Sequence, residues 1–454
     1  MRVRPPAGRV RSATLVASID VTTSEHHRTR PSVRIARRFF GVLIVAIGCL
    51  VAVVAGAFAI LLVAAELPSA VLFLGAGLVV AFVVALLIGR AGSAVAGRGW
   101  RPALIVSVAW SAALALLFGL TFLQPFPVQP SAPIPAGVAF WELPDGSRLA
   151  YTTSPATGPT KPVPVVFLHG GPGTPSEGLP YGTAELNAAG YDVYSYDQIG
   201  AGRSTRLSDV TGYTVERNVA DLEAVRELIG AERLIVIGQS WGGSLAAQYL
   251  AAHPDRVDKV VFTSPGEIWP AAHPDTDVDP WGELTGADRE RYDELTSDPR
   301  FLLQSVLLEN NPQASHSLIG DAEADSRLHE IAVTGRHLAS CPGGPPGDGE
   351  VHQNPQGFYT NQMTNADFET VPDPRPALRN LDTPALVLRA ECDYVPWVDT
   401  RDYRDALPAS TLVYLPGAGH GITDQAGPAY LEAILGFLAG DQLRGYDGEE
   451  DPSR

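Results

Sequence analysis

The stretch Leu234-Ile235-Val236-Ile237-Gly238-Gln239-Ser240-Trp241-Gly242 decides the fold. Its four leading apolar residues are typical of a buried strand, and residues 244–250, which follow it, have the composition of a helix. Gly238 and Gly242 stand where larger side chains would collide with the strand or the helix in a strained turn. The pattern predicts a nucleophile elbow, which holds the Ser240 hydroxyl clear of the sheet. The alternative is a plain strand–turn–helix connection that contains a serine.

A second glycine-rich loop, His169-Gly170-Gly171-Pro172-Gly173, lies upstream. Residues 163–168 before it are typical of a buried strand, with Pro164 near the start, where a missing N–H is tolerated. A loop of this kind supplies one backbone donor of an oxyanion hole, for which Gly171 is the candidate. The N–H of Trp241, at the helix N-terminus, is the candidate for the other donor. Taken alone, the loop is equally explained as a turn between a strand and a helix.

Two further strand-like runs supply candidates for a general base and its acid partner. Residues 384–390 lead into Glu391-Cys392-Asp393, and residues 411–415 lead into Gly419-His420-Gly421. The order serine, acid, histidine along the chain predicts His420 as the general base and Asp393 as the acid. Glu391 and Asp399 are the alternates for the acid, and each is otherwise an ordinary loop carboxylate.

Together these residues predict hydrolysis at a carbonyl group. Ser240 would attack the carbonyl carbon, while His420 takes its proton and later gives it to the leaving group. Asp393 would orient the imidazole and stabilise its charged form. No metal or organic cofactor is required. Gly200-Ala201-Gly202 is not a dinucleotide fingerprint, because Thr205 occupies the place of the third glycine.

The motifs resemble those of the proline iminopeptidase (prolyl aminopeptidase) branch of the α/β-hydrolases. His169–Gly173 matches that family's HGGPG, Asp197–Ser204 is similar to its DQRGxGRS, and Gly238–Gly243 is similar to its GGSWGS. The likeness covers about residues 137–440. It implies an α/β-hydrolase fold with a helical cap insertion, and removal of N-terminal residues, such as Pro, from peptides. Ile199 stands where the family usually has Arg, and Gln239 and Gly243 replace the usual Gly and Ser, so the preferred residue stays open.

Charge divides the chain into two parts. Residues 1–134 hold twelve Arg and three acidic residues, a balance of +9, whereas residues 135–454 hold 21 basic and 47 acidic residues, a balance of −26. A nucleic-acid partner is not expected for so acidic a domain. Two or more structural units are expected from a chain of 454 residues.

Three uncharged apolar segments lie in the basic part, at residues 39–65, 67–89 and 102–127. Each exceeds the roughly 20 residues that a helix needs to cross a bilayer core. The sequence therefore predicts three transmembrane helices within residues 39–124, in contact with the lipid bilayer. Arginines lie before the first segment and between the second and third, so the positive-inside rule places the N-terminus in the cytoplasm and the chain after the third span outside.

The segments around the spans have compositions of their own. Residues 1–38 are basic and predict a disordered cytoplasmic arm, and residues 125–136 are rich in Pro and predict an extended linker. Residues 137–440 are the expected α/β-hydrolase domain. The acidic residues 441–454 predict a disordered tail.

A long insertion follows the strand-like residues 260–263 and predicts the cap, at about residues 266–380. Cap carboxylates such as Glu267, Glu283 and Glu309 are candidates to bind the free amine of a substrate, although each is individually explained as a solvated surface group. A disulfide between Cys341 and Cys392 is permitted outside the cell, but spacing cannot show that the two residues meet.

The leading hypothesis is a membrane-anchored extracellular serine aminopeptidase that uses a Ser-His-Asp triad, with Pro as one candidate for the residue it removes. An esterase or amidase acting on a small ester or amide is the alternative, because both reactions use the same triad. A non-catalytic surface binding protein is the third hypothesis, and it requires none of the triad residues. The oligomeric state is unknown from sequence.

Overall fold

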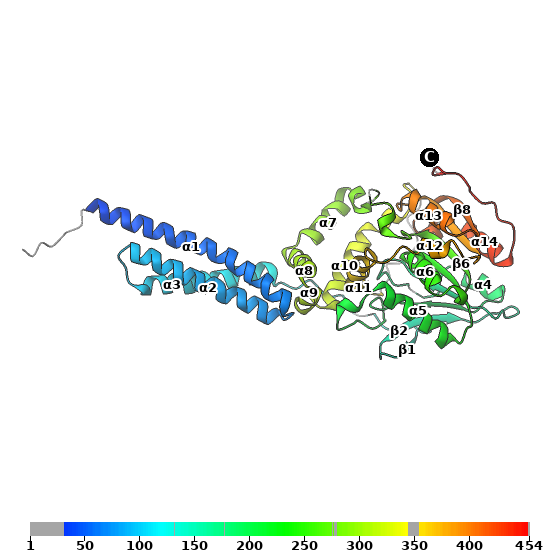
Figure 1. Cartoon of the computed structure of the whole chain (residues 1–454), viewed down its shortest axis with the longest axis horizontal. Helices are drawn as coiled ribbons and strands as arrows, with labels where there is room; N and C mark the ends of the chain where they lie inside the picture. The colour runs from blue at the N-terminus through cyan, green and yellow to red at the C-terminus, as the bar shows by residue number, and fades with distance from the viewer. Residues whose placement is uncertain are drawn as a thin grey trace, which may run out of the picture. The chain divides into compact units, whose positions relative to one another are not determined.

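The computed structural model describes residues 31–130, 132–176, 178–274, 276, 279–343 and 354–452 (Figure 1). Residues 1–30 of the predicted basic arm and Ser131 of the predicted linker lie outside the described residues. By its contacts the chain divides into two compact units. One unit is Met1–Val53 with Ala81–Trp110, and the other is Val54–Val80 with Ser111–Arg454.

Three helices, α1 (Pro31–Glu66), α2 (Ala70–Val95) and α3 (Trp100–Phe122), are long and apolar enough to cross a membrane. In the first unit, a Cβ at Gly41 would lie 2.6 Å from the Gly92 carbonyl oxygen, so glycine permits the close approach of α1 and α2. The prediction of disorder up to residue 38 is wrong from Pro31 onward. Proline suits a first helical turn, and the arginines after it are good helix formers.

The second unit contains an eight-stranded sheet in the order β1-β2-β4-β3-β5-β6-β7-β8. The strands β1 and β2 are antiparallel to their neighbours, and the others run parallel. The strands are β1 (Ala139–Glu142), β2 (Arg148–Ser154), β3 (Val165–Leu168), β4 (Val193–Tyr196), β5 (Leu234–Ser240), β6 (Val257–Pro265), β7 (Ala385–Cys392) and β8 (Ser410–Gly419). Five of them lie where the sequence predicts strands, whereas β1, β2 and β4 were not predicted.

Both faces of the parallel strands are buried, which explains their continuous apolar sequences. Successive side chains alternate between the faces, so Val165 joins one core cluster and Val166 joins the other. One cluster includes residues of α5, α6 and α13, and the other includes residues of α4 and α14 (Figure 1). These helices are α4 (Thr183–Ala188), α5 (Val215–Ile229), α6 (Trp241–Ala252), α13 (Trp397–Ala406) and α14 (Ile422–Ala439).

The chain between β6 and β7 is helical, as predicted for the cap, and is called the cap below. Its α-helices are α7 (Gly286–Ser297), α8 (Pro299–Asn310), α9 (Pro312–Leu318), α10 (Asp321–Gly335), α11 (Phe358–Phe368) and α12 (Arg375–Leu378). Its 3₁₀ turns are η3 (Pro270–Ala272), η4 (Pro280–Glu283) and η5 (Arg336–Ala339); η1 (Val210–Gly212) and η2 (Pro254–Arg256) lie earlier in the chain.

Two segments predicted to be extended or disordered are bound to the domain. In the linker, the backbone N–H groups of Phe126 and Gln129 donate to Glu323 and Ser326 on α10, at 2.9 and 3.0 Å. In the tail, the N–H of Tyr446 donates to the Leu412 carbonyl at 2.7 Å. The prediction of a disordered tail is therefore wrong for residues 441–452, because acidic composition alone does not reveal partners brought by the fold.

Candidate active site

Ser240 ends β5, and Trp241 begins α6. Ser240 has a φ of 54° and a ψ of −123°, which is a strained conformation for a residue that is not glycine. A Cβ at Gly238 would overlap the Gly242 carbonyl, and a Cβ at Gly242 would overlap the Leu168 carbonyl. The two glycines thus permit the tight turn between strand and helix that the sequence predicts.

A cavity of about 240 Å³ opens beside Ser240. Gly171 and Trp241, the two predicted oxyanion donors, lie in its wall with Ser240. Gly171 has a φ of 115°, a conformation that favours glycine, and a Cβ there would lie 2.6 Å from the Gly173 nitrogen. Gly171, the first candidate oxyanion donor, therefore has a backbone conformation that a residue with a side chain would disrupt.

His420 lies directly after β8, and its Nδ1 hydrogen-bonds to Asp393 Oδ1 at 2.7 Å. The Asp393 side chain is fully buried, and its Oδ1 also accepts the N–H of Val395 at 3.0 Å. Burial alone would raise the pKa of Asp393, but the charge and hydrogen bond of His420, with Arg389, outweigh it and hold the pKa below its usual value. Asp393 is thus an ionised partner for the imidazole.

The two alternate acids make other interactions. Glu391 Oε2 accepts the N–H of Gly417 at 2.6 Å. Asp399 is buried, and this burial, with the nearby Glu267 and Asp402, raises its pKa to about 7. Between Ser240 and His420, no hydrogen bond is present in the part of the chain that the structure describes. Such bonds are often long before substrate binds, so the complete triad stays a prediction.

His169 supports the oxyanion loop rather than serving as a base. Its Nε2 accepts the N–H of Gln198 at 2.9 Å, so its Nδ1 donates to the Gly170 carbonyl at 2.8 Å. Burial lowers the pKa of His169 to about 4, which keeps the ring neutral. Gln198 Oε1 in turn accepts the Trp241 Nε1–H at 2.9 Å. Sequence reasoning missed this link between the loop and the elbow, although Gln198 belongs to one of the three quoted motifs.

Comparisons with known proteins identify the fold and several similar sequences. Residues 163–308 match the family model described as the alpha/beta hydrolase fold. The proline iminopeptidase of Lactobacillus delbrueckii subsp. lactis is 26% identical over 293 residues, which are 62% of this chain and 91% of that protein. The chain has an α/β-hydrolase fold and is similar to proline iminopeptidases.

Other matches of the chain are shorter or more distant. The proline iminopeptidase of Heyndrickxia coagulans is 38% identical over 104 residues, and the chain spans 35% of that protein's length. Among solved structures, the proline iminopeptidase of Mycobacterium smegmatis is 19% identical with a TM-score of 0.43, over 67% of this chain and 100% of that one. The chain thus spans about a third of the length of several of the curated relatives that it matches.

The cap contributes one of its three candidate acidic residues to the wall of the cavity beside Ser240. Glu267 lines the cavity with Ser240, and its carbonyl accepts the Ser244 hydroxyl at 2.6 Å. Phe368 of α11 also lines it, packing edge-on against Trp241 at 5.2 Å between ring centroids. Glu283 and Glu309 are exposed and are not part of this wall. Sequence alone could not separate the three.

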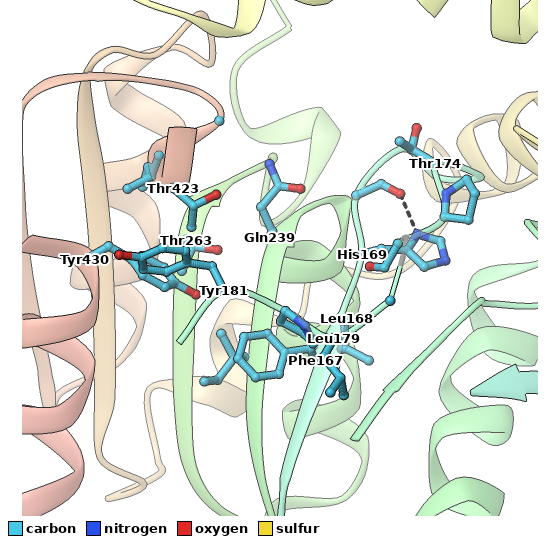
Figure 2. A pocket seen from close by; sticks show the side chains of 18 residues that line it. Phe167, Leu168, His169, Thr174, Leu179, Tyr181, Gln239, Thr263, Thr423 and Tyr430 are labelled. Carbon is cyan, nitrogen blue, oxygen red and sulfur yellow. Dashed lines mark hydrogen bonds between the residues drawn. The ribbon is translucent and has the colours of Figure 1, made fainter. Parts of the chain in front are cut away.

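A second cavity, of about 350 Å³, has Gln239 of the elbow in its wall (Figure 2). Gln239 and Gly170 line it, whereas their successors Ser240 and Gly171 line the first cavity. Its wall also contains Phe167, Tyr181, Thr263, Thr423 and Tyr430. The elbow and the oxyanion loop therefore each contribute residues to both cavities.

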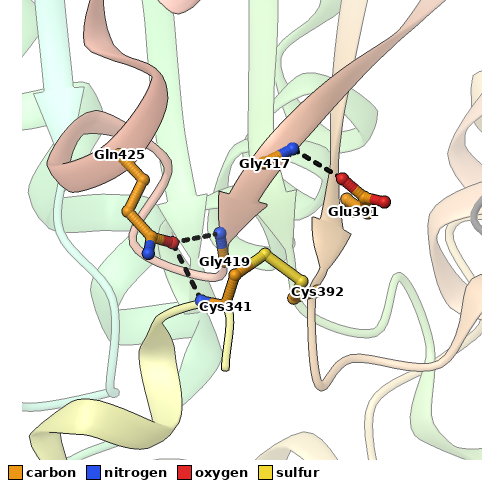
Figure 3. The surroundings of a disulfide bond; sticks show 6 residues. All are labelled: Cys341, Glu391, Cys392, Gly417, Gly419 and Gln425. Atoms are coloured by element: carbon orange, nitrogen blue, oxygen red, sulfur yellow. Dashed lines mark hydrogen bonds between the residues drawn. A yellow bond between two sulfur atoms is a disulfide. The ribbon is translucent and has the colours of Figure 1, made fainter. Parts of the chain in front are cut away.

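The open question about the cysteines is answered by the structure. Cys341 of the cap and Cys392 at the end of β7 form a disulfide, with their Cα atoms 5.1 Å apart (Figure 3). Cys49, in α1, is a free thiol.

Proposed function

We propose that this chain is a membrane-anchored extracellular serine aminopeptidase. The observation that carries the proposal is the His420–Asp393 hydrogen bond at the same sheet edge as the Ser240 elbow, beside a cavity whose wall includes the cap residue Glu267. The similarity to proline iminopeptidases supports the substrate class.

In the proposed mechanism, Ser240 Oγ attacks the carbonyl carbon of the first residue while His420 takes its proton. The N–H groups of Gly171 and Trp241 stabilise the oxyanion. His420 then protonates the leaving amine, and water, activated by the same imidazole, hydrolyses the acyl-enzyme. Asp393, ionised and buried, holds the ring and stabilises its charge.

The first cavity suits the residue that is removed. At about 240 Å³ it is small, so it would admit one amino-acid side chain rather than a peptide running through it. The Glu267 carboxylate in its wall would pair with the substrate's ammonium group and set the distance to the scissile carbonyl. The second cavity lies on the side of Gly421, next to His420, where the leaving group would depart.

An esterase or amidase is the second candidate, because the same residues would hydrolyse a simple acyl ester. A panel of chromogenic aminoacyl amides and short acyl esters separates the two. The full chain in detergent is the appropriate sample. Asn311 Nδ2 of the cap donates to the Ala64 carbonyl in α1 at 2.9 Å, and Leu307 and Ala314 pack with Ala64 and Phe73, so removal of the spans would expose cap surface.

The extracellular location is a separate proposal. Three apolar helices, the arginine distribution and a disulfide, which persists in oxidising compartments, support it. We expect protease treatment of intact cells, or of spheroplasts where a wall blocks access, to digest or release the hydrolase domain while a cytoplasmic marker stays intact. Protection of both the domain and the marker would contradict the proposed orientation.

A further inference from the structure

The disulfide lies next to the proposed acid–base pair. Cys392 is the last residue of β7 and immediately precedes Asp393. It pairs in register with Gly419 of β8, which immediately precedes His420. A covalent bond at Cys392 therefore attaches the cap segment 339–341 to the point where both catalytic loops begin.

The same cap segment also binds the histidine loop. Gln425 Oε1 accepts two N–H groups, from Cys341 at 2.9 Å and from Gly419 at 3.0 Å (Figure 3). The N–H of Gly421 donates to the Ala339 carbonyl at 2.9 Å. Both neighbours of His420 are thus hydrogen-bonded to the cap segment or to the side chain that holds it.

The packing at this point leaves little room for the loop to shift. A Cβ at Gly419 would lie 2.5 Å from the Cα of Ser340 and would overlap the Ala339 carbonyl. Asp393, by contrast, has supports outside the cap, namely the Val395 N–H at 3.0 Å and Arg389 Nη1 at 3.7 Å. Release of the cap segment would therefore disturb His420 more than Asp393.

We propose that the Cys341–Cys392 disulfide and Gln425 form one positioning unit, which presses cap segment 339–341 against the histidine loop and fixes His420 for proton transfer. None of Cys341, Cys392 and Gln425 would touch the substrate or the reacting atoms. The proposal rests on the proposed serine hydrolase function and assigns a role to residues outside the triad.

Small displacements of a general base have large effects on rate, and an error of about 1 Å costs up to about 100-fold. We expect reduction of the disulfide to lower kcat by about 10- to 100-fold with a smaller change in KM. Two thiols of an added dithiol reductant are oxidised to a disulfide as Cys341 and Cys392 become thiols. The Cys341→Ala/Cys392→Ala variant should start at the low kcat and be insensitive to the reductant.

Gln425 provides a matched pair of substitutions that keep the disulfide. Gln425→Leu removes the acceptor for both N–H groups at similar volume and should lower kcat by about tenfold or more. Gln425→Glu retains an acceptor oxygen and should stay within about threefold of the wild-type kcat. Thermal unfolding of each variant shows that the comparison is made on folded protein.

The rate of Ser240 labelling by a fluorophosphonate probe supplies a readout that does not depend on the natural substrate. We expect reduction and Gln425→Leu to slow labelling in proportion to kcat, and Cys49→Ala to leave it unchanged. Equal labelling rates for the wild type and the folded cysteine double variant would overturn the positioning role alone. A wild-type chain that the probe never labels would overturn the proposed hydrolase as well.

Discussion

Replacing Ser240 by alanine is expected to lower kcat/KM by at least about 10⁴-fold, because the nucleophile, base and acid act as one unit. The domain should keep its fold, since alanine removes only a hydroxyl from a turn whose shape depends on Gly238 and Gly242. Hydrolysis of a chromogenic aminoacyl amide by the full chain in detergent measures the loss, and circular dichroism checks the fold.

Two companion variants make this test specific. His420→Ala should lower kcat/KM by a similar factor. The double variant should be no less active than either single variant, because loss of one residue already abolishes the joint action of the triad. Ser208→Ala, an exposed serine of the same domain, should keep wild-type activity. Retention of more than a few per cent of activity by Ser240→Ala would mean that another residue is the nucleophile.

Removing the positive charge from the substrate is expected to reduce its hydrolysis by about 100-fold or more. N-acetylation of a prolyl or alanyl amide abolishes the ammonium group that would pair with Glu267 in the cavity wall, and a desolvated charge pair of this kind is worth several kcal/mol. Steady-state kcat/KM for the free and the acetylated amide measures the effect. Equal values would reject the aminopeptidase and favour the esterase or amidase.

The variant Glu267→Gln tests whether Glu267 is the residue that recognises the substrate's ammonium group. It should lower kcat/KM for the free aminoacyl amide by about 10- to 100-fold and leave a simple acyl ester unaffected, because the ester carries no ammonium group. Glu283→Gln and Glu309→Gln remove exposed carboxylates outside the cavity and should change neither substrate. A loss of ester hydrolysis in Glu267→Gln would instead indicate damage to the site.

The parts of the site that the sequence predicts are those set by local rules. Gly238 and Gly242 mark the turn, and the order of the motifs places the candidate acid and base after neighbouring parallel strands. The choice among Asp393, Glu391 and Asp399 depends on how one loop folds back on His420, which no local pattern encodes. For the same reason, the sequence does not predict whether Cys341 and Cys392 form a disulfide.

The unpredicted features depend on contacts between distant segments. The strands β1 and β4 have four residues each, and β1 and β2 run antiparallel to their neighbours at one side of the sheet. Glu267 is distinguished from Glu283 and Glu309 only by the cap's path over the elbow. Residues 441–452 have the composition of a disordered tail, but Leu412 and its neighbours provide partners for them.

The bound tail places Asp451 beside Arg389, the arginine that also lies next to the proposed acid Asp393. Arg389 is almost fully buried, and its Nη1 lies 3.7 Å from Asp393 Oδ2 while its Nη2 donates to Asp451 at 3.2 Å. Asp451 and Asp393 thus share the positive charge of Arg389. Trimming the tail to ease crystallisation, or fusing an affinity tag to it, would therefore change the electrostatic surroundings of Asp393, which lies 58 positions before Asp451. A purification tag is therefore better placed at the N-terminus.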